Sequence, residues 1–162
     1  MRVAVEMTLK GLDRFDLAIL RNLAGNGRIS VTDLARRVGL SKSPTQARLR
    51  RLEKSGIITG YRAMINPITF GLDHVSFVEV SLNDTREAAL TDFNFRVVQI
   101  PEIEQVHLIA GSFDYLLKVR TQSITDYRRV LAEQISTLPH VAKTSTYVAM
   151  EAVKETTSED LI

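Results

Sequence analysis

The spacing of apolar residues changes at residues 62–72 of this 162-residue chain, and no other feature constrains its fold as strongly. Before this point, apolar residues recur every three or four positions in three short segments, as is typical of amphipathic helices. After it, runs rich in β-branched residues alternate with helical segments. The pattern predicts an α+β chain with a helical domain at residues 1–60, a linker at 61–72, an αβ domain at 73–155 and a tail at 156–162.

Charge is divided in the same way. Residues 1–62 hold 13 Lys and Arg against 5 Asp and Glu, a net charge of +8, whereas residues 63–162 hold 8 against 14, a net charge of −6. A basic domain joined to an acidic one suggests that the basic domain binds a polyanion such as nucleic acid. A solvated basic surface without such a partner would have the same composition.

The composition also excludes several classes of protein. There is no cysteine, so disulfides and thiolate chemistry are excluded, and a reducing cytoplasm suits the chain. No apolar run approaches the ~20 residues that a membrane-spanning helix requires. The first ten residues lack the uninterrupted apolar segment of a signal peptide. We therefore expect a cytoplasmic protein that does not associate with membranes.

Three helices are predicted in the N-terminal domain, at about residues 13–24, 30–39 and 41–55. Ser30 is a suitable N-cap for the second helix, and Gly39 supplies the positive φ that ends it. Ser41 is a capping residue at the start of the third helix. β-type residues on both sides of Gly60, within residues 57–63, predict a small hairpin, the wing of a winged helix-turn-helix.

The third predicted helix has two different faces at 100° per residue. Thr45, Leu49 and Leu52 lie on one face and are expected to pack inward. The opposite face carries cations and no acidic residue, which suits a helix in the major groove of DNA. Its N-terminal part should meet base edges and its later part phosphates. The expected base contacts are Ser43, Gln46, Ala47 and Arg50, and the expected phosphate contacts are Lys42, Arg51 and Lys54. A basic three-helix module that binds another protein is the alternative.

The C-terminal domain has the element order β-α-β-β-α-β, which predicts a ferredoxin-like fold. The expected strands are residues 75–82, 104–110, 115–120 and 143–150, and the expected helices are residues 85–99 and 125–137. Two helices would cover one face of the sheet. A second copy of the chain is the simplest cover for the other face, so we expect a dimer.

The loop at residues 111–115, with the sequence GSFDY, is the most chemically distinctive segment of this domain. The backbone around Gly111 leaves N–H groups open to a carboxylate, and Asp114 is suited to hold an ammonium group. Together they would grip a zwitterionic amino acid. A plain hairpin turn is the alternative, because Gly and Asp are common turn residues.

Several blocks of sequence, in order, resemble the Lrp/AsnC family of leucine-responsive, or feast/famine, transcriptional regulators. The blocks are LDRFD at residues 12–16, GRIS at 27–30, LARRVGL at 34–40, RLRRLE at 48–53, GIITGY at 56–61, NP at 66–67, VHLIAGSFDYLL at 106–117 and TYV at 146–148. Each block alone has little specificity, whereas their order and spacing over residues 12–155 are specific.

The resemblance implies a helix-turn-helix domain and a RAM domain, which binds the effector and forms dimers that assemble further into tetramers or octamers. It also implies that an amino acid binds between dimers, near residues 111–114. The effector-binding residues expected from the resemblance are His107, Leu108, Gly111, Ser112, Asp114 and Tyr115, with Ile124 and Val148 as further candidates. The apolar members of this set favour a small apolar effector such as leucine or proline.

The sequence therefore predicts a DNA-binding transcriptional regulator of amino-acid metabolism, with no cofactor and no metal. No nucleophile elbow, P-loop or dinucleotide-binding glycine pattern supports an enzyme, and His74, His107 and His140 lack the spacing of metal ligands. An effector-independent architectural DNA-binding protein is the main alternative. Acid–base catalysis by His107 with Asp114, and RNA binding on the sheet, are weaker alternatives.

Overall fold

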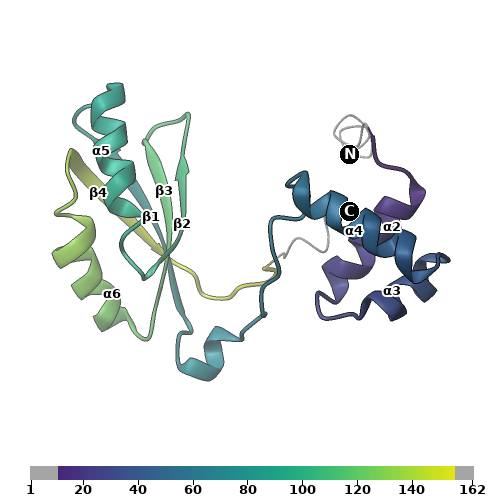
Figure 1. Ribbon diagram of the computed structural model, residues 1–162. Coiled ribbons are helices and arrows are strands. Elements are labelled where there is room, and N and C mark those ends of the chain that lie inside the picture. Colours follow the sequence, from purple (N-terminus) through teal and green to yellow (C-terminus); the bar gives the residue numbers. More distant parts are fainter. Residues whose placement is uncertain (1–10, 156–162) are drawn as a thin grey trace. The chain divides into compact units, whose positions relative to one another are not determined.

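The computed structural model of the chain describes residues 11–155 (Figure 1). The predicted tail at residues 156–162 lies outside the described residues. The described chain forms two compact units, one that extends to Met64 and one that spans Ile65–Val153. Among residues 11–155, no helix combines the length and the apolar character that crossing a membrane requires.

The described part of the N-terminal unit contains three helices, which agree with the predicted ones to within one or two residues: α2 (Arg14–Gly25), α3 (Val31–Val38) and α4 (Lys42–Lys54). Ile19, Leu34 and Leu52 contribute one fully buried side chain from each helix to a shared core. Each of these residues lies on the apolar stripe of its helix, so the helical period of the sequence determines how the three helices pack.

The ends of α3 confirm the predicted capping residues. The side chain of Ser30 accepts a hydrogen bond from the Asp33 N–H at 3.0 Å, and Gly39 adopts a left-handed conformation with φ of 73°. Helix α4 begins differently, because the Ser41 side chain makes no capping hydrogen bond. Instead, the Thr45 hydroxyl donates to the Ser41 carbonyl at 2.9 Å.

The predicted hairpin at residues 57–63 is not formed, since the described backbone of this segment contains no strand. The N–H groups of Ile57 and Ile58 both donate to the Leu52 carbonyl at 3.1 Å, so they complete the end of α4 and cannot pair with a second strand. The Tyr61 hydroxyl donates to Glu53 of α4 at 2.9 Å. These contacts with α4 hold the segment as an irregular continuation of the helix.

The second unit begins with a short 3₁₀ helix, Pro67–Phe70, which ends at Gly71 with φ of 70°. Its main elements follow the predicted order: β1 (His74–Leu82), α5 (Glu87–Val97), β2 (Ile103–Leu108), β3 (Tyr115–Thr121), α6 (Ile124–Val130) and β4 (Val141–Val148). The sheet is antiparallel with the strand order β2-β3-β1-β4. This topology confirms the ferredoxin-like prediction.

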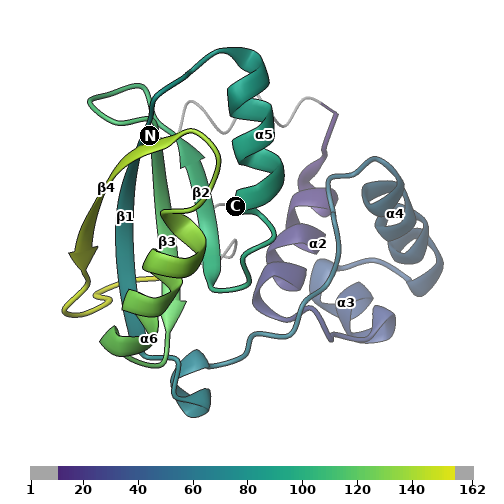
Figure 2. The same ribbon diagram turned by 90° about the vertical axis from the view of Figure 1, so that its left-hand side faces the viewer.

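Helices α5 and α6 both lie on one face of the sheet, as Figures 1 and 2 show from two directions. Phe93 of α5 and Val130 of α6 are fully buried against Val78 and Leu117 of the two central strands. The predicted helix at residues 125–137 changes to a π-helical turn at Leu131–Ile135, where the Ser136 N–H donates to the Leu131 carbonyl at 2.8 Å.

The other face of the sheet carries side chains that no helix of this unit covers. Phe77 and Glu79 of β1 alternate with the buried residues of the strand and point to this face. Tyr147 of β4 pairs with Phe77, and Leu116 of β3 pairs with Glu79. Phe77 is 36% exposed and Tyr147 is 55% exposed. Two aromatic side chains are thus accessible on the face for which a second copy of the chain was expected.

Candidate nucleic-acid interface and effector site

The inner face of α4 is fixed by the core of the N-terminal unit. Thr45 and Leu52 are fully buried, and Leu49 packs against the same core. These are the three residues that the sequence predicted to point inward. Because the helix cannot rotate without exposing them, the opposite face of α4 is held toward solvent.

That opposite face presents most of the predicted DNA-contacting residues. Gln46 is half-buried, whereas the other six are exposed: Lys42, Ser43, Ala47, Arg50, Arg51 and Lys54. The only acidic residue within α4 is Glu53, which accepts the hydrogen bond of Tyr61. The arrangement suits a helix that lies in a groove of DNA, with cations available to the phosphates.

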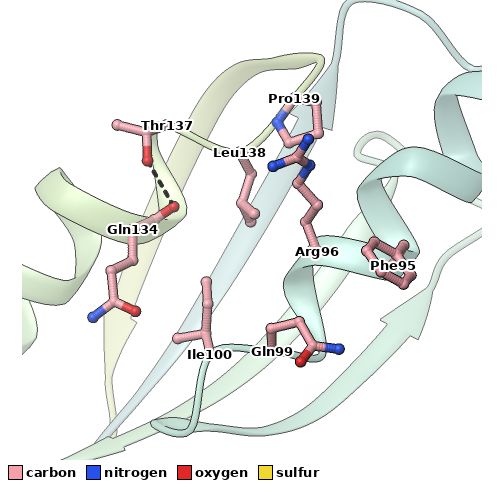
Figure 3. A pocket seen from close by; sticks show the side chains of 8 residues that line it. All are labelled: Phe95, Arg96, Gln99, Ile100, Gln134, Thr137, Leu138 and Pro139. Carbon is pink, nitrogen blue, oxygen red and sulfur yellow. Dashed lines mark hydrogen bonds between the residues drawn. The ribbon is translucent and has the colours of Figure 1, made fainter.

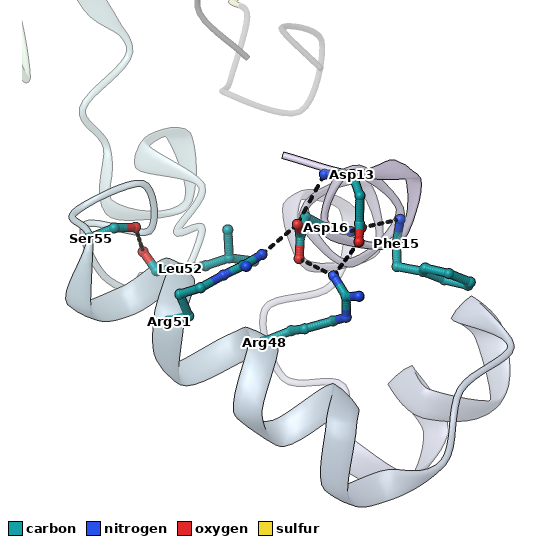
Figure 4. Close-up of polar contacts among 7 residues, drawn as sticks. All are labelled: Asp13, Phe15, Asp16, Arg48, Arg51, Leu52 and Ser55. Atoms are coloured by element: carbon teal, nitrogen blue, oxygen red, sulfur yellow. Dashed lines mark hydrogen bonds and ion pairs between the residues drawn. The ribbon is translucent and has the colours of Figure 1, made fainter. Parts of the chain in front are cut away.

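One of these residues, Arg51, has a protein partner that the sequence did not reveal. Its Nη2 lies 2.5 Å from Oδ2 of Asp16, a residue of α2 whose side chain is 1% exposed (Figure 4). Arg48 contacts the other oxygen of the same carboxylate, with Nη1 2.9 Å from Oδ1. Arg48 Nη1 also lies 2.7 Å from Oδ2 of Asp13, the N-cap of α2. Two arginines of α4 thus converge on one buried carboxylate.

The charges of this cluster stabilise one another. Hydrogen bonds to Asp16 and then Asp13 raise the pKa of the Arg48 guanidinium. The pKa of Asp13 is lowered, first by the hydrogen bond from the Asp16 N–H and also by Arg48. The sequence did contain a signal for Asp16, because it occupies a position between Leu12, Ile19 and Leu20 on the apolar stripe of α2. A charged residue on such a stripe requires a buried partner.

The loop at residues 111–115 is held to the neighbouring strand through Asp114. Its Oδ2 accepts the Leu82 N–H at 2.7 Å, and its own N–H donates to the Val80 carbonyl at 3.0 Å. Both bonds run to β1, whereas the bond of a hairpin turn is a third one, in which the Ile109 N–H donates to the Asp114 carbonyl at 2.8 Å. One oxygen of the Asp114 carboxylate is therefore already engaged by the Leu82 N–H, and the predicted binding of an ammonium group would involve a carboxylate that also has this structural role.

The predicted effector residues separate into three groups in the structure. His107, Leu108, Gly111 and Ser112 are exposed at the loop end of the β2–β3 hairpin, where Asp114 is half-buried. Tyr115 does not belong with them, because its side chain is 1% exposed and packs on Phe93 with ring centroids 4.4 Å apart. Tyr115 is therefore a core residue, and its prediction as a lining residue is corrected.

Ile124 and Val148 lie toward the opposite end of the sheet from the loop. Val148 pairs with Ser76 near the start of β1, and Ile124 follows the end of β3, whereas the loop precedes Tyr115 at the start of β3. A seven-residue strand spans roughly 20 Å. One chain therefore does not bring all eight predicted residues together. A site that includes both groups needs two chains.

A separate cavity of about 560 Å³ lies on the helical side of the sheet, between the end of α5 and the segment before β4 (Figure 3). Its lining residues are Phe95, Arg96, Gln99, Ile100, Gln134, Thr137, Leu138 and Pro139. It shares no residue with the predicted effector site. Within residues 11–155, no group of three or more His, Asp or Glu residues is arranged to hold a metal ion.

Two family matches cover most of the chain. Residues 12–59 match the winged helix-turn-helix DNA-binding family, and residues 75–159 match the Lrp/AsnC ligand binding domain. The hairpin is not formed in this structure, although the family that matches this unit is described as winged.

Curated relatives align over nearly their whole length. The chain is 58% identical to the proline dehydrogenase transcriptional activator of Rhodobacter capsulatus over 150 residues, which are 93% of this chain and 97% of the relative. It is 59% identical to the protein of the same name from Rhizobium radiobacter, over 90% of this chain and 93% of the relative. It is 45% identical to the leucine-responsive regulatory protein of Escherichia coli K12, over 90% and 89%.

Solved structures of regulators share the fold. A transcriptional regulator from Neisseria meningitidis in complex with L-methionine superposes with a TM-score of 0.85 at 31% identity, over 91% of this chain and 95% of that chain. The AsnC protein of E. coli superposes with a TM-score of 0.84 at 25% identity, over 91% and 98%. With both domains matched in order, the chain belongs to the Lrp/AsnC family of transcriptional regulators.

Proposed function

We propose that this regulator binds specific DNA sites through α4, senses a small amino acid through its second unit, and activates a gene of proline catabolism. The observation that carries the DNA-binding part is the outer face of α4, which presents exposed cations while Thr45 and Leu52 fix the inner face. We assign Ser43, Gln46, Ala47 and Arg50 to base edges and Lys42, Arg51 and Lys54 to phosphates.

Proline is the effector that we favour. The two relatives with 58% and 59% identity are both named proline dehydrogenase transcriptional activators. An activator of a catabolic gene is useful when the substrate of the encoded enzyme is present, so proline itself is a suitable signal. Its small apolar ring suits the exposed apolar side chains of Leu108, Ile124 and Val148. The methionine bound to the Neisseria regulator supports an amino acid as the class of ligand.

We place the effector between chains, because the loop and the pair Ile124 and Val148 lie at opposite ends of the sheet in one chain. A shared site couples ligand binding to assembly. Assembly then sets the spacing of the DNA-binding units, and thereby which pairs of DNA sites are bound at once. The accessible aromatic face with Phe77 and Tyr147 supports a dimer, and tetramers or octamers of such dimers are part of the proposal. The protein acts in the cytoplasm, where its DNA is.

Thermal unfolding of the purified chain in the presence of each of the twenty amino acids tests the sensor. A ligand at 100 times its Kd stabilises the native state by about 2.7 kcal/mol. Proline is expected to raise the midpoint most. Binding to the DNA upstream of the chain's own proline dehydrogenase gene is then measured with and without proline, together with the assembly size by sedimentation. If no amino acid shifts the midpoint and DNA binding is indifferent to sequence, the effector-independent architectural protein replaces this proposal.

Gly111→Ala tests the loop without breaking its fold. The backbone of Gly111 does not adopt a positive φ, and an added Cβ would lie 3.4 Å from Cγ2 of Ile109, an ordinary contact. The matched control is Gly25→Ala, for which no atom lies within 4 Å of the added Cβ. The loop variant should weaken stabilisation by proline and the control should not. Asp114→Ala is a less selective test, because it also removes the bond to Leu82.

A further inference from the structure

The carboxylate of Asp16 connects α2 to α4, the helix that we assign to DNA. Arg48 and Arg51, three positions apart on α4, hold its two oxygens at 2.9 and 2.5 Å (Figure 4). The Asp13 N–H donates to Oδ2 at 3.1 Å. A carboxylate buried this deeply is tolerated only when its oxygens are satisfied, so the cluster favours one arrangement of α2 and α4.

The two arginines differ in exposure. The side chain of Arg48 is 26% exposed and also contacts Asp13, so it acts within the protein. The side chain of Arg51 is 55% exposed, although its Nη2 contacts Asp16. A guanidinium carries five N–H donors in a planar fork, so one arginine can hold a carboxylate on one side and a phosphate on the other. The carboxylate then sets the plane in which the remaining donors of Arg51 point.

We propose that Asp16 is a positioning residue for DNA recognition, which acts through Arg48 and Arg51. By holding both guanidinium groups, it refines, within the orientation that the core allows, the rotation of α4 that presents Gln46, Ala47 and Arg50 to base edges. It also orients Arg51 toward a DNA phosphate. This inference rests on the proposed DNA-binding function of α4.

The sign of its effect separates positioning from simple electrostatics. Asp16 is negative and lies next to a surface that binds a polyanion, so loss of its charge alone should strengthen binding to any DNA. Loss of positioning should instead weaken binding to the specific site, because the base contacts depend on the orientation of α4. The ratio of specific to non-specific affinity is therefore the decisive quantity.

The experiment uses the full chain with Asp16→Asn. One duplex is selected from random sequence by the wild-type protein, and the other is a shuffled duplex of equal length and composition. Affinities for both are measured over a range of salt concentrations. The specificity ratio should fall by about tenfold or more, as expected when a base contact is lost, while affinity for the shuffled duplex is retained or increased. A folded Asp16→Asn protein with an unchanged ratio would overturn the proposal.

The matched control is Asp33→Asn, which removes an exposed carboxylate from the same unit. Asp33 forms an ion pair with Arg36 of α3 at 2.5 Å. This ion pair is separate from those that Asp16 makes with Arg48 and Arg51. This variant loses the same charge, so its specificity ratio should equal that of the wild type. If the specificity ratio fell equally in Asp33→Asn and Asp16→Asn, the loss of one negative charge would explain the fall, and the positioning role would be overturned.

Lysine variants keep the test decisive if Asp16→Asn fails to fold. Arg48→Lys with Arg51→Lys keeps both positive charges near Asp16 but loses the planar fork. The specificity ratio should fall in this variant while thermal unfolding shows a folded unit, and an unchanged ratio would overturn the proposal. Arg51→Gln should lower the slope of log affinity against log salt by about 0.9, the value for one phosphate contact. An unchanged slope would remove the phosphate contact of Arg51 from the proposal.

The same experiment distinguishes a failure of the proposed DNA-binding function from a failure of the positioning role of Asp16. A wild-type protein that selects no duplex from random sequence would overturn the DNA-binding function, and the positioning role with it. A wild-type protein that selects a duplex, together with variants that keep the specificity ratio, would overturn the positioning role alone.

Discussion

The two units of this regulator build their candidate sites in opposite ways. In the N-terminal unit, the proposed DNA contacts lie on one helix of 13 residues, whose inner face is anchored in the core. In the second unit, the proposed effector contacts lie at both ends of a sheet within one chain, so our proposal brings them together through another chain. The first kind of site depends on local helix geometry, whereas the second depends on assembly.

The largest expected effect is a loss of stability that is confined to the second unit. Phe93→Ala removes a fully buried ring from α5 and should destabilise the second unit by about 3–5 kcal/mol. Chemical denaturation followed by a probe in each unit measures this. Phe95→Ala, two positions along the same helix, removes a ring that is 71% exposed and should have little effect. Equal losses in the two variants would contradict the packing of α5 described above.

A mixing experiment tests whether the effector site needs two chains. Leu108→Asp and Ile124→Asp change side chains that are 61% and 55% exposed, so both variants should fold. Each alone should lose most of the roughly 2.7 kcal/mol by which proline at 100 times its Kd stabilises the protein. Because the two residues would come from different chains, unfolding and refolding the two variants together should restore part of that stabilisation.

The control for this experiment is Phe95→Asp, which alters the cavity of Figure 3. It should leave the stabilisation by proline unchanged. If Phe95→Asp removes the stabilisation while Leu108→Asp does not, the effector binds on the helical side within one chain. The contrast between a local and an assembled site would then no longer hold.

The same contrast explains what the sequence could predict. The two faces of α4 follow from a period of 3.6 residues, so Thr45 and Arg50 were placed correctly on opposite sides. The partner of Arg51 could not be identified in this way, since Asp16 lies 35 positions earlier in the chain. Periodicity shows that a position is buried, but it does not show which distant side chain meets it there.

The second unit shows the same limit. The alternation of strands and helices was sufficient for the ferredoxin-like order. The family resemblance placed Tyr115 in the effector site, but alternation along β3 turns its ring toward Phe93 in the core. The prediction of a hairpin at residues 57–63 was wrong for a local reason, because the N–H groups of Ile57 and Ile58 donate to the Leu52 carbonyl at the end of α4.

A smaller effect is expected when one base contact of α4 is removed. Arg50→Ala should weaken binding to the selected duplex by about 1–3 kcal/mol, the range for a bidentate arginine–base contact. Arg21→Ala removes an exposed cation from α2 and should change binding to all duplexes similarly. Titrations with selected and shuffled duplexes distinguish the two. Stabilisation of Arg50→Ala by proline should equal that of the wild type, and its loss would show that the two sites are not separate.

The smallest effect concerns the capping of the two helices of the helix-turn-helix. Ser30→Ala removes a side chain that accepts the Asp33 N–H and should cost about 1 kcal/mol. Ser41→Ala, at the start of α4, removes a side chain with no capping bond and should cost less. Chemical denaturation of the N-terminal unit measures both. A cost for Ser41→Ala as large as that for Ser30→Ala would show that α4 is capped in a way that this structure does not contain.

Ser30 also makes the stability of this unit depend on pH through the carboxylate of Asp33, and this dependence should weaken in Ser30→Ala. The Ser30 hydroxyl and then Arg36 lower the pKa of Asp33 below its usual 3.8. A lowered pKa in the folded state means that this interaction stabilises the unit fully above the unfolded value, and that the stabilisation is lost as the pH falls through the folded value. Carboxyl chemical shifts followed by NMR should show the pKa of Asp33 rising toward 3.8 in Ser30→Ala. Because Arg36 remains in that variant, the pKa should stay somewhat below 3.8, and a complete return would mean that Arg36 contributes nothing.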